Sequence, residues 1–173
     1  MGPETERSAN AEGLDGPTLS TMAGLARQLG ITLLAGSVLE TGAPGGRLFN
    51  TSVLFGPDGS RLGVYRKVHL FDVDVGDGQK YHESAAVAPG AELVVAQTPI
   101  GNVGLSVCYD LRFPELYREL SKRGANVLTV PAAFTLMSTE LLVTSATLSV
   151  QPVTAAALLT QPLPPTGTKV RVP

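Results

Sequence analysis

The chain has a single cysteine and no tryptophan among its 173 residues. One cysteine cannot form an internal disulfide, which fits a protein of the reducing cytoplasm. The nine tyrosines and phenylalanines are spread along the chain, lysine and arginine form no basic patch, and the net charge is −2. This pattern does not support a nucleic-acid surface and favours no strongly charged partner. We therefore expect a cytoplasmic protein that does not bind nucleic acid.

The sequence also lacks a signal peptide and a clear membrane span. Its first residues are polar and acidic, unlike a secretory signal. The stretch from Leu141 to Thr160 has no charge, but its hydroxyl side chains, Gln151 and Pro152 disfavour insertion into a bilayer. With 43% hydrophobic and 16% charged residues, the composition is ordinary for a globular protein. We expect no membrane partner.

Helical and strand-like segments alternate up to about residue 135, which predicts an α/β fold. Helical spacing runs from Pro17 to Leu29 and stops at Gly30. A second helix is expected from Pro114 to Arg123. Strands are expected over residues 31–39, 48–55, 61–68, 93–97, 102–109 and 126–131. The polar segment from Phe71 to Gly90 shows neither period and is predicted to be a long surface loop, the kind of segment that often carries function.

The sequence changes character after residue 135. Between residues 136 and 173 the charged residues are Glu140, Lys169 and Arg171, and there is no aromatic residue. Four prolines interrupt any regular element in this segment. We therefore divide the chain into a domain at 1–135 and a low-charge tail at 136–173, which has the composition of a frameshifted or disordered segment.

Cys108 lies where a buried strand is expected to give way to a helix. Pro114 fits the first helical position, and the N–H groups beyond it give that helix end a partial positive charge. A thiol near such an end, or near a lysine, can have a lowered pKa and populate the reactive thiolate. A lone cysteine can equally be a small buried hydrophobic residue. The local pattern leaves both interpretations open.

Gly56-Pro-Asp-Gly59 separates the strands expected over 48–55 and 61–68, which predicts a hairpin. Lys67 lies at the end of the second hairpin strand, in the segment Tyr65-Arg-Lys-Val-His-Leu-Phe71. Taken alone, a lysine beside an arginine at a strand end is typical of a solvated charge. The segment becomes more informative beside the cysteine segment, Gly104-Leu-Ser-Val-Cys-Tyr-Asp-Leu-Arg-Phe-Pro-Glu115. Together the two segments resemble the nitrilase, or carbon–nitrogen hydrolase, superfamily, and most closely its branch of small-amide amidases.

The resemblance covers roughly residues 10–135 and implies a nitrilase-type α-β-β-α sandwich that here lacks its first elements and its C-terminal third. It implies hydrolysis of a non-peptide C–N bond in a small carboxylate-bearing amide through a cysteine thioester. Intact members of the family are expected to be homodimers. No cofactor is implied, and His69 and His82 lack the spacing of metal ligands.

The resemblance also assigns roles to individual residues. Cys108 would attack the amide carbonyl, while Lys67 and the backbone N–H of Tyr109 stabilise the oxyanion. Glu83 would fix the lysine and the cysteine, although a glutamate in a polar loop can also be merely solvated. Arg112 could bind an acidic substrate group, or it could form a structural ion pair with Asp110, which could instead cap the following helix.

The family also uses a glutamate near the end of its first strand as the proton shuttle. Pro3-Glu4 is superficially similar, but no apolar strand precedes it, so we do not assign the role to Glu4 and expect a solvated loop residue. We expect the chain to begin just after the catalytic glutamate. Two functions remain open: an amidase, or an inactive fragment that binds small molecules or a partner subunit. A redox-sensing thiol has no resolving cysteine to support it.

Overall fold

The computed structural model describes residues 9–74 and 80–133. The helices are α2 (Pro17–Leu29) and α3 (Pro114–Lys122). The strands are β1 (Leu33–Glu40), β2 (Phe49–Phe55), β3 (Arg61–Arg66), β4 (Asp72–Asp74), β5 (Lys80–His82), β6 (Val95–Thr98), β7 (Gly101–Leu105) and β8 (Val127–Thr129). Three short 3₁₀ turns are η1 (Pro44–Gly46), η2 (Glu83–Ala85) and η3 (Cys108–Arg112). The predicted tail at 136–173 and the stretch from Leu141 to Thr160 lie outside the described residues.

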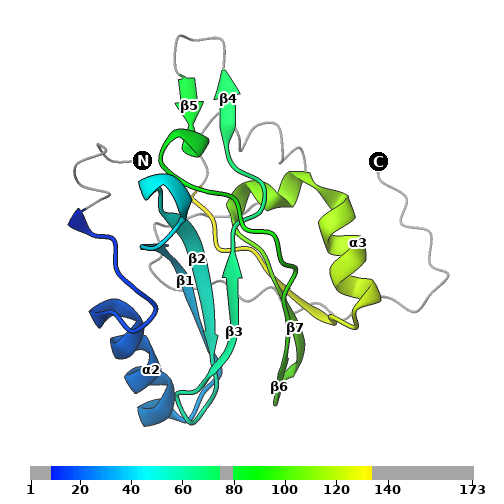
Figure 1. Cartoon of the computed structure of the whole chain (residues 1–173). Coiled ribbons are helices and arrows are strands. Elements are labelled where there is room, and N and C mark those ends of the chain that lie inside the picture. The colour runs from blue at the N-terminus through cyan, green and yellow to red at the C-terminus, as the bar shows by residue number, and fades with distance from the viewer. Residues whose placement is uncertain (1–8, 75–79, 134–173) are drawn as a thin grey trace, which may run out of the picture.

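The elements form four layers, in the order helix, sheet, sheet, helix (Figure 1). One sheet has the strand order β1-β2-β3 with antiparallel pairing throughout. The other has the order β6-β7-β8, in which β6 pairs antiparallel and β8 pairs parallel with β7. Helix α2 covers the outer face of the first sheet, and α3 covers the outer face of the second. The predicted α-β-β-α sandwich is confirmed.

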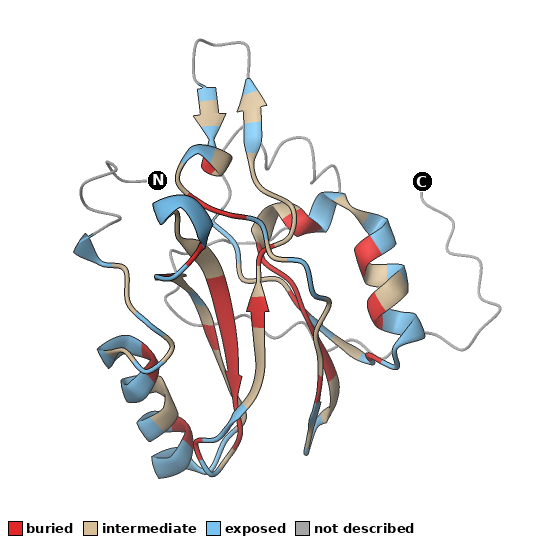
Figure 2. Cartoon of the chain, viewed as in Figure 1, coloured by how far each residue is buried: buried red, intermediate tan, exposed pale blue. Residues whose placement is uncertain are grey.

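Each interface between layers has its own group of buried apolar side chains (Figure 2). The group between the two sheets consists of Leu54, Tyr65, Ala96, Val103, Leu105 and Val107. The group under α2 consists of Leu19, Ala26, Ala35, Val53 and Phe55. Leu116, Leu120 and Ala125 form the third group, under α3. Val53 and Phe55 pack under α2 whereas Leu54 packs between the sheets, so the end of β2 is apolar at consecutive positions because both of its faces are buried.

Helix α2 and the first hairpin match their predictions closely. Gly30 ends α2 with a left-handed φ of 63°, as glycine readily does. The hairpin prediction is confirmed by the antiparallel pairing of β2 with β3. At the end of that hairpin Gly90 donates its N–H to the carbonyl oxygen of Lys67 over 2.8 Å, and a Cβ at Gly90 would overlap the carbonyl oxygen of Arg66. The chain after β5 can therefore approach β3 only through a glycine.

Two sequence predictions need correction. The segment from Phe71 to Gly90 is not an irregular loop, because β4 and β5 pair antiparallel within it and η2 follows. Its short strands carry charged residues at alternate positions, so neither periodicity was strong enough to see. The strand predicted over 102–109 ends at Leu105, and a 3₁₀ turn separates Cys108 from α3. None of the described helices is long and apolar enough to cross a membrane.

A buried carboxylate, Glu40 at the end of β1, links the three strands of the first sheet through hydrogen bonds to β2 and β3. Glu40 is 4% exposed and accepts two hydrogen bonds from the Arg66 guanidinium, at 2.6 and 2.8 Å, and one from the Thr51 hydroxyl at 2.6 Å. Burial opposes ionisation, but the bonds from Arg66 and Thr51 outweigh it and hold the pKa of Glu40 below its usual value.

We expect Glu40→Gln to lower the free energy of unfolding by about 1–2 kcal/mol at pH 7, because charge-assisted hydrogen bonds are lost and Arg66 is partly exposed. A carboxyl with a depressed folded pKa stabilises above its unfolded pKa, about 4.3, and loses that contribution as the pH falls through the folded value. The difference between Glu40→Gln and the original chain should therefore shrink below pH 4 in urea titrations. Glu119→Gln, at an exposed ion pair of α3, is the control and should cost little at either pH.

Candidate active site

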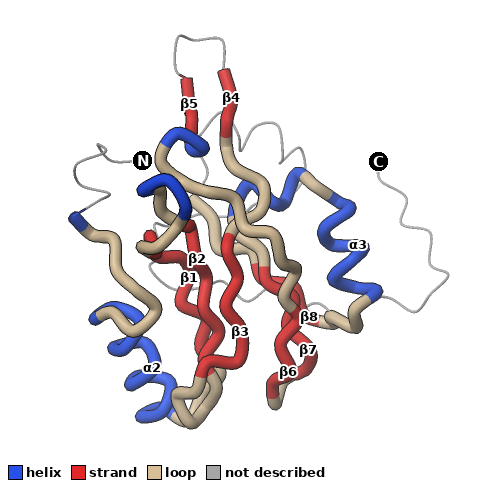
Figure 3. The backbone as a smooth tube through the Cα atoms, viewed as in Figure 1, coloured by secondary structure: helices blue, strands red, loops and turns tan. Residues whose placement is uncertain are grey.

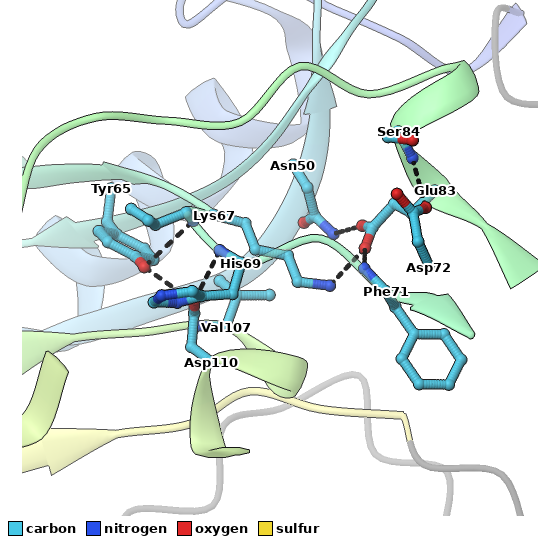
Figure 4. Close-up of polar contacts among 11 residues, drawn as sticks. Asn50, Tyr65, Lys67, His69, Phe71, Asp72, Glu83, Ser84, Val107 and Asp110 are labelled. Atoms are coloured by element: carbon cyan, nitrogen blue, oxygen red, sulfur yellow. Dashed lines mark hydrogen bonds and ion pairs between the residues drawn. The ribbon is translucent and has the colours of Figure 1, made fainter. Parts of the chain in front are cut away.

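Lys67 and Glu83 form a buried ion pair where the sheet β1-β2-β3 meets the β4-β5 hairpin. The Lys67 ammonium lies 2.6 Å from Oε2 of Glu83, and the two side chains are only 2% and 1% exposed (Figure 4). Lys67 extends β3 by one residue, with its N–H donating to the carbonyl oxygen of Asn50. The sequence alone left open that Lys67 and Glu83 are solvated surface charges. The structure shows that both are buried.

Glu83 accepts hydrogen bonds on both carboxylate oxygens. Oε2 accepts from the Lys67 ammonium and from the backbone N–H of Phe71 at 2.7 Å, while Oε1 accepts from Nδ2 of Asn50 at 3.1 Å. These three donors satisfy the hydrogen-bonding capacity that a buried carboxylate must meet. Glu83 therefore holds the ammonium of Lys67 in place, and its oxygens are already occupied. Asn50 is a site residue that the sequence analysis missed, since an asparagine beside a strand carries no specific signal.

Cys108 begins the 3₁₀ turn η3 with a φ of 50°, the one positive φ of a residue other than glycine in the described part of the chain. Its N–H donates to the carbonyl oxygen of Pro131 at 3.0 Å, beyond the end of β8. Figure 3 shows the turn between the end of β7 and the start of α3. Strained backbone of this kind persists only where neighbours enforce it, and it is common at functional sites.

The pKa of the Cys108 thiol is raised, so the lowering that a helix end or a lysine can cause does not prevail here. Burial is the largest cause, and the negative charge of Glu83 adds to it. The positive charge of Lys67 and the backbone N–H groups of Ala133 and Tyr109 act in the opposite direction but do not outweigh burial. The turn η3 also keeps the N-terminus of α3 several residues away from the thiol. The resting form at neutral pH is therefore the thiol, and a base must remove its proton before attack.

Asp110 is fully buried and links the cysteine turn to the lysine strand. Its Oδ2 accepts from the Tyr65 hydroxyl at 2.7 Å and from the Val107 N–H at 2.9 Å. Its Oδ1 accepts from the backbone N–H of His69 at 3.0 Å and lies 2.8 Å from Nδ1 of the same residue (Figure 4). Asp110 thus caps its own turn and pairs with His69, and the suggested ion pair with Arg112 is not what occupies it.

Aromatic side chains pack around the same junction. The rings of His69 and Phe113 stack with 3.7 Å between their centroids. The ring of Tyr109 lies edge-on to those of Phe113 and Phe71, with centroid distances of 5.6 and 4.9 Å. Tyr109 therefore packs against both the lysine segment and the cysteine segment, and its N–H also binds the thiol. His69 could have been noticed from sequence, because Tyr65, Lys67 and His69 occupy alternate positions that face the same side of an extended chain.

Arg112 closes the cysteine turn and is exposed to solvent. It stands four residues from the nucleophile candidate and is the cation of the turn. In the parts of the chain that the structure describes, no group of three histidine, cysteine or acidic side chains could hold a metal ion.

The sequence of the chain matches the profile of a known protein family. The carbon-nitrogen hydrolase profile matches residues 2–155. The chain belongs to the carbon–nitrogen hydrolase family. The match extends beyond residue 135, and the division into a domain at 1–135 and a tail stays a prediction.

The curated relatives of this carbon–nitrogen hydrolase include amidases. A deaminated glutathione amidase of Synechocystis is 46% identical over 138 residues, covering 78% of this chain and 51% of the relative. The omega-amidase NIT2 of Homo sapiens is 41% identical over 126 residues, covering 73% and 45%. The chain thus spans about half the length of the curated relatives it matches.

Solved structures of nitrilase-superfamily members and amidases are also similar to this chain. Nit3 of Saccharomyces cerevisiae, a member of branch 10 of the nitrilase superfamily, matches with a TM-score of 0.66 at 30% identity, over 78% of this chain and 47% of that one. An amidase mutant from Nesterenkonia sp. AN1, which carries acrylamide added at its active site cysteine, matches with a TM-score of 0.58 at 32% identity, over 71% and 45%. The nitrilase-type fold predicted from the sequence is confirmed by both.

The raised thiol pKa predicts a distinctive pH profile for alkylation of Cys108. Because the thiolate is the reactive form, the rate with iodoacetamide should rise with a midpoint above that of the unfolded chain, about 8.5. Lys67→Met should move the midpoint higher still, since it removes a charge that lowers the thiol pKa and leaves Glu83 uncompensated. Lys122→Met, on the exposed face of α3, is the matched control. Equal midpoints for Lys67→Met and the original chain would show that the lysine does not act on the thiol.

Proposed function

We propose that this chain carries the active site of an amidase that acts on small carboxylate-bearing amides, with Cys108 as nucleophile. The observation that carries the proposal is the buried Lys67–Glu83 pair beside a strained cysteine turn, an arrangement that costs free energy and has no evident structural need. The relatives named as omega-amidase and deaminated glutathione amidase support the substrate class.

The reaction proceeds by two substitutions at the amide carbon. The Cys108 sulfur forms a bond to this carbon, and the charge that develops on oxygen is stabilised by the Lys67 ammonium and the Tyr109 N–H. The C–N bond then breaks, and the amine or ammonia leaves with the proton taken from the thiol. Water attacks the thioester, which releases the acid and restores the thiol. The cysteine adduct in the Nesterenkonia amidase supports this choice of nucleophile.

The thiol proton needs a base within hydrogen-bond reach. The three buried carboxylates in the described residues are Glu40, Glu83 and Asp110, and each accepts hydrogen bonds on both oxygens. Glu83 binds the Lys67 ammonium directly, so we assign it as a positioning residue for Lys67. We propose no cofactor or metal, a cytoplasmic location, and a homodimer as the assembled form.

A second candidate function rests on the donors that already bind the three buried carboxylates of the described residues. If none of these carboxylates takes up the thiol proton, the chain accepts an acyl group on Cys108 and does not hydrolyse it, so that it acts as a single-turnover binder or as a partner subunit. The two functions can be distinguished by the mass of the protein after exposure to substrate, because an acyl group that is not hydrolysed stays on Cys108.

We expect the original chain to release ammonia from short ω-amides and Cys108→Ala to lose at least about 100-fold of that rate, as loss of a nucleophile does elsewhere. Intact mass after incubation distinguishes the candidates, because a stoichiometric adduct without continued ammonia release indicates blocked deacylation. An unchanged ammonia rate in Cys108→Ala would exclude the proposed nucleophile. Circular dichroism of Cys108→Ala is the control that the variant is folded.

Arg112 is proposed to bind the substrate carboxylate. We expect Arg112→Leu to slow acylation by a carboxylate-bearing amide about tenfold at low substrate concentration, since one charge-assisted hydrogen bond is lost. Acylation by a neutral amide of the same length should not change. Arg118→Leu, exposed on α3, serves as the control. Equal losses on both substrates would assign Arg112 a structural role.

A further inference from the structure

Asp110 ties together the two segments that supply the nucleophile and the lysine. Val107, which donates to Oδ2, immediately precedes Cys108 in the chain. Tyr65 and His69, which donate to the two oxygens, lie two residues before and two residues after Lys67. One carboxylate therefore binds the residue before Cys108 and the residues two positions before and after Lys67; Figure 4 shows Asp110 among Tyr65, His69 and Val107.

The partners of Asp110 match a group that only accepts hydrogen bonds. All of its backbone and tyrosine partners are donors, and the side chain is fully buried. An amide in its place could accept on one oxygen only and would present an NH₂ group to donors on the other side. Burial and the negative charge of Asp110 both raise the pKa of Tyr65, so its hydroxyl remains a donor. The network is thus specific for aspartate.

The cysteine turn needs such a constraint. Cys108 holds a left-handed φ of 50°, a conformation that its own side chain disfavours. Two backbone N–H groups fix the chain as it enters the strained residue: that of Val107 binds Asp110, and that of Cys108 binds the carbonyl oxygen of Pro131. Only the first of these also connects the turn to β3.

We propose that Asp110 is a positioning residue that fixes the Cys108 thiol relative to the Lys67 ammonium. It does so through Val107 on one side and through Tyr65 and His69 on the other, without touching the reacting atoms. The proposal rests on the proposed function, because it concerns how the same site is assembled.

The test is the pH profile of Cys108 alkylation in Asp110→Asn, measured on the full chain with iodoacetamide. The charged groups that act on the thiol are Lys67 and Glu83, and the lowering effect of Lys67 depends on its distance. When the turn shifts away from the lysine, the midpoint should rise by about one pH unit, and the rate below the midpoint should fall about tenfold.

Controls separate positioning from loss of stability. Val53→Ala removes core packing under α2, far from the site, and should lower thermal stability while leaving the alkylation midpoint unchanged. Tyr65→Phe removes one donor and keeps the ring, so it should shift the midpoint in the same direction by a smaller amount. If Asp110→Asn does not fold, Tyr65→Phe decides the question by the same measurement.

The outcomes also separate this inference from the proposed function. An unchanged midpoint in Asp110→Asn, or in Tyr65→Phe where the first variant does not fold, overturns the positioning role while a shift in Lys67→Met leaves the amidase site standing. If Lys67→Met also leaves the midpoint unchanged, the thiol and the lysine do not act together and both proposals fail. A shift in Asp110→Asn that Val53→Ala reproduces at equal stability would reduce the effect to general destabilisation and would likewise overturn the inference.

Discussion

The buried ion pair between Lys67 and Glu83 is the constraint on which the rest of the site depends. Removing both charges from water costs several kcal/mol for each ion, and their mutual attraction alone does not reliably offset that cost. The remaining compensation comes from the Asn50 amide and the Phe71 N–H, which bind the same carboxylate. The β4-β5 hairpin, the end of β3 and the start of β2 must therefore all be in place before the lysine can be buried.

The end of β3 serves two faces of its sheet because side chains alternate along an extended chain. Arg66 projects outward and forms the bidentate pair with Glu40, whereas Tyr65 and Lys67 project inward to Asp110 and Glu83. The strand end is consequently held on both sides by charged hydrogen bonds. A one-residue slip in the register of β3 would exchange these faces and separate Tyr65, Arg66 and Lys67 from these partners, which fixes the register strongly.

The elements that the sequence predicted well are those whose signals are local. Helix α2 has its glycine stop, and the first hairpin has its turn between two apolar runs, so both could be placed from a few neighbouring residues. The turn at Cys108 could not, because its left-handed φ is imposed by Asp110 and Pro131 rather than by residues that prefer it. Lys67 and Glu83 were found through a family resemblance, but their burial depends on contacts over 16 residues of chain that no local pattern encodes.

The raised pKa of Cys108 changes how the site must work. A thiolate that was stable at neutral pH could attack without help, and the lysine would only need to stabilise the oxyanion. Here burial keeps the proton on sulfur, although the positive charge of Lys67 acts in the opposite direction. Under the proposed mechanism, Lys67 lowers the cost of forming negative charge, first on sulfur and then on the substrate oxygen, while Glu83 holds Lys67 in position. The same mechanism also needs a base within hydrogen-bond reach of the thiol, because a buried thiol does not lose its proton unaided.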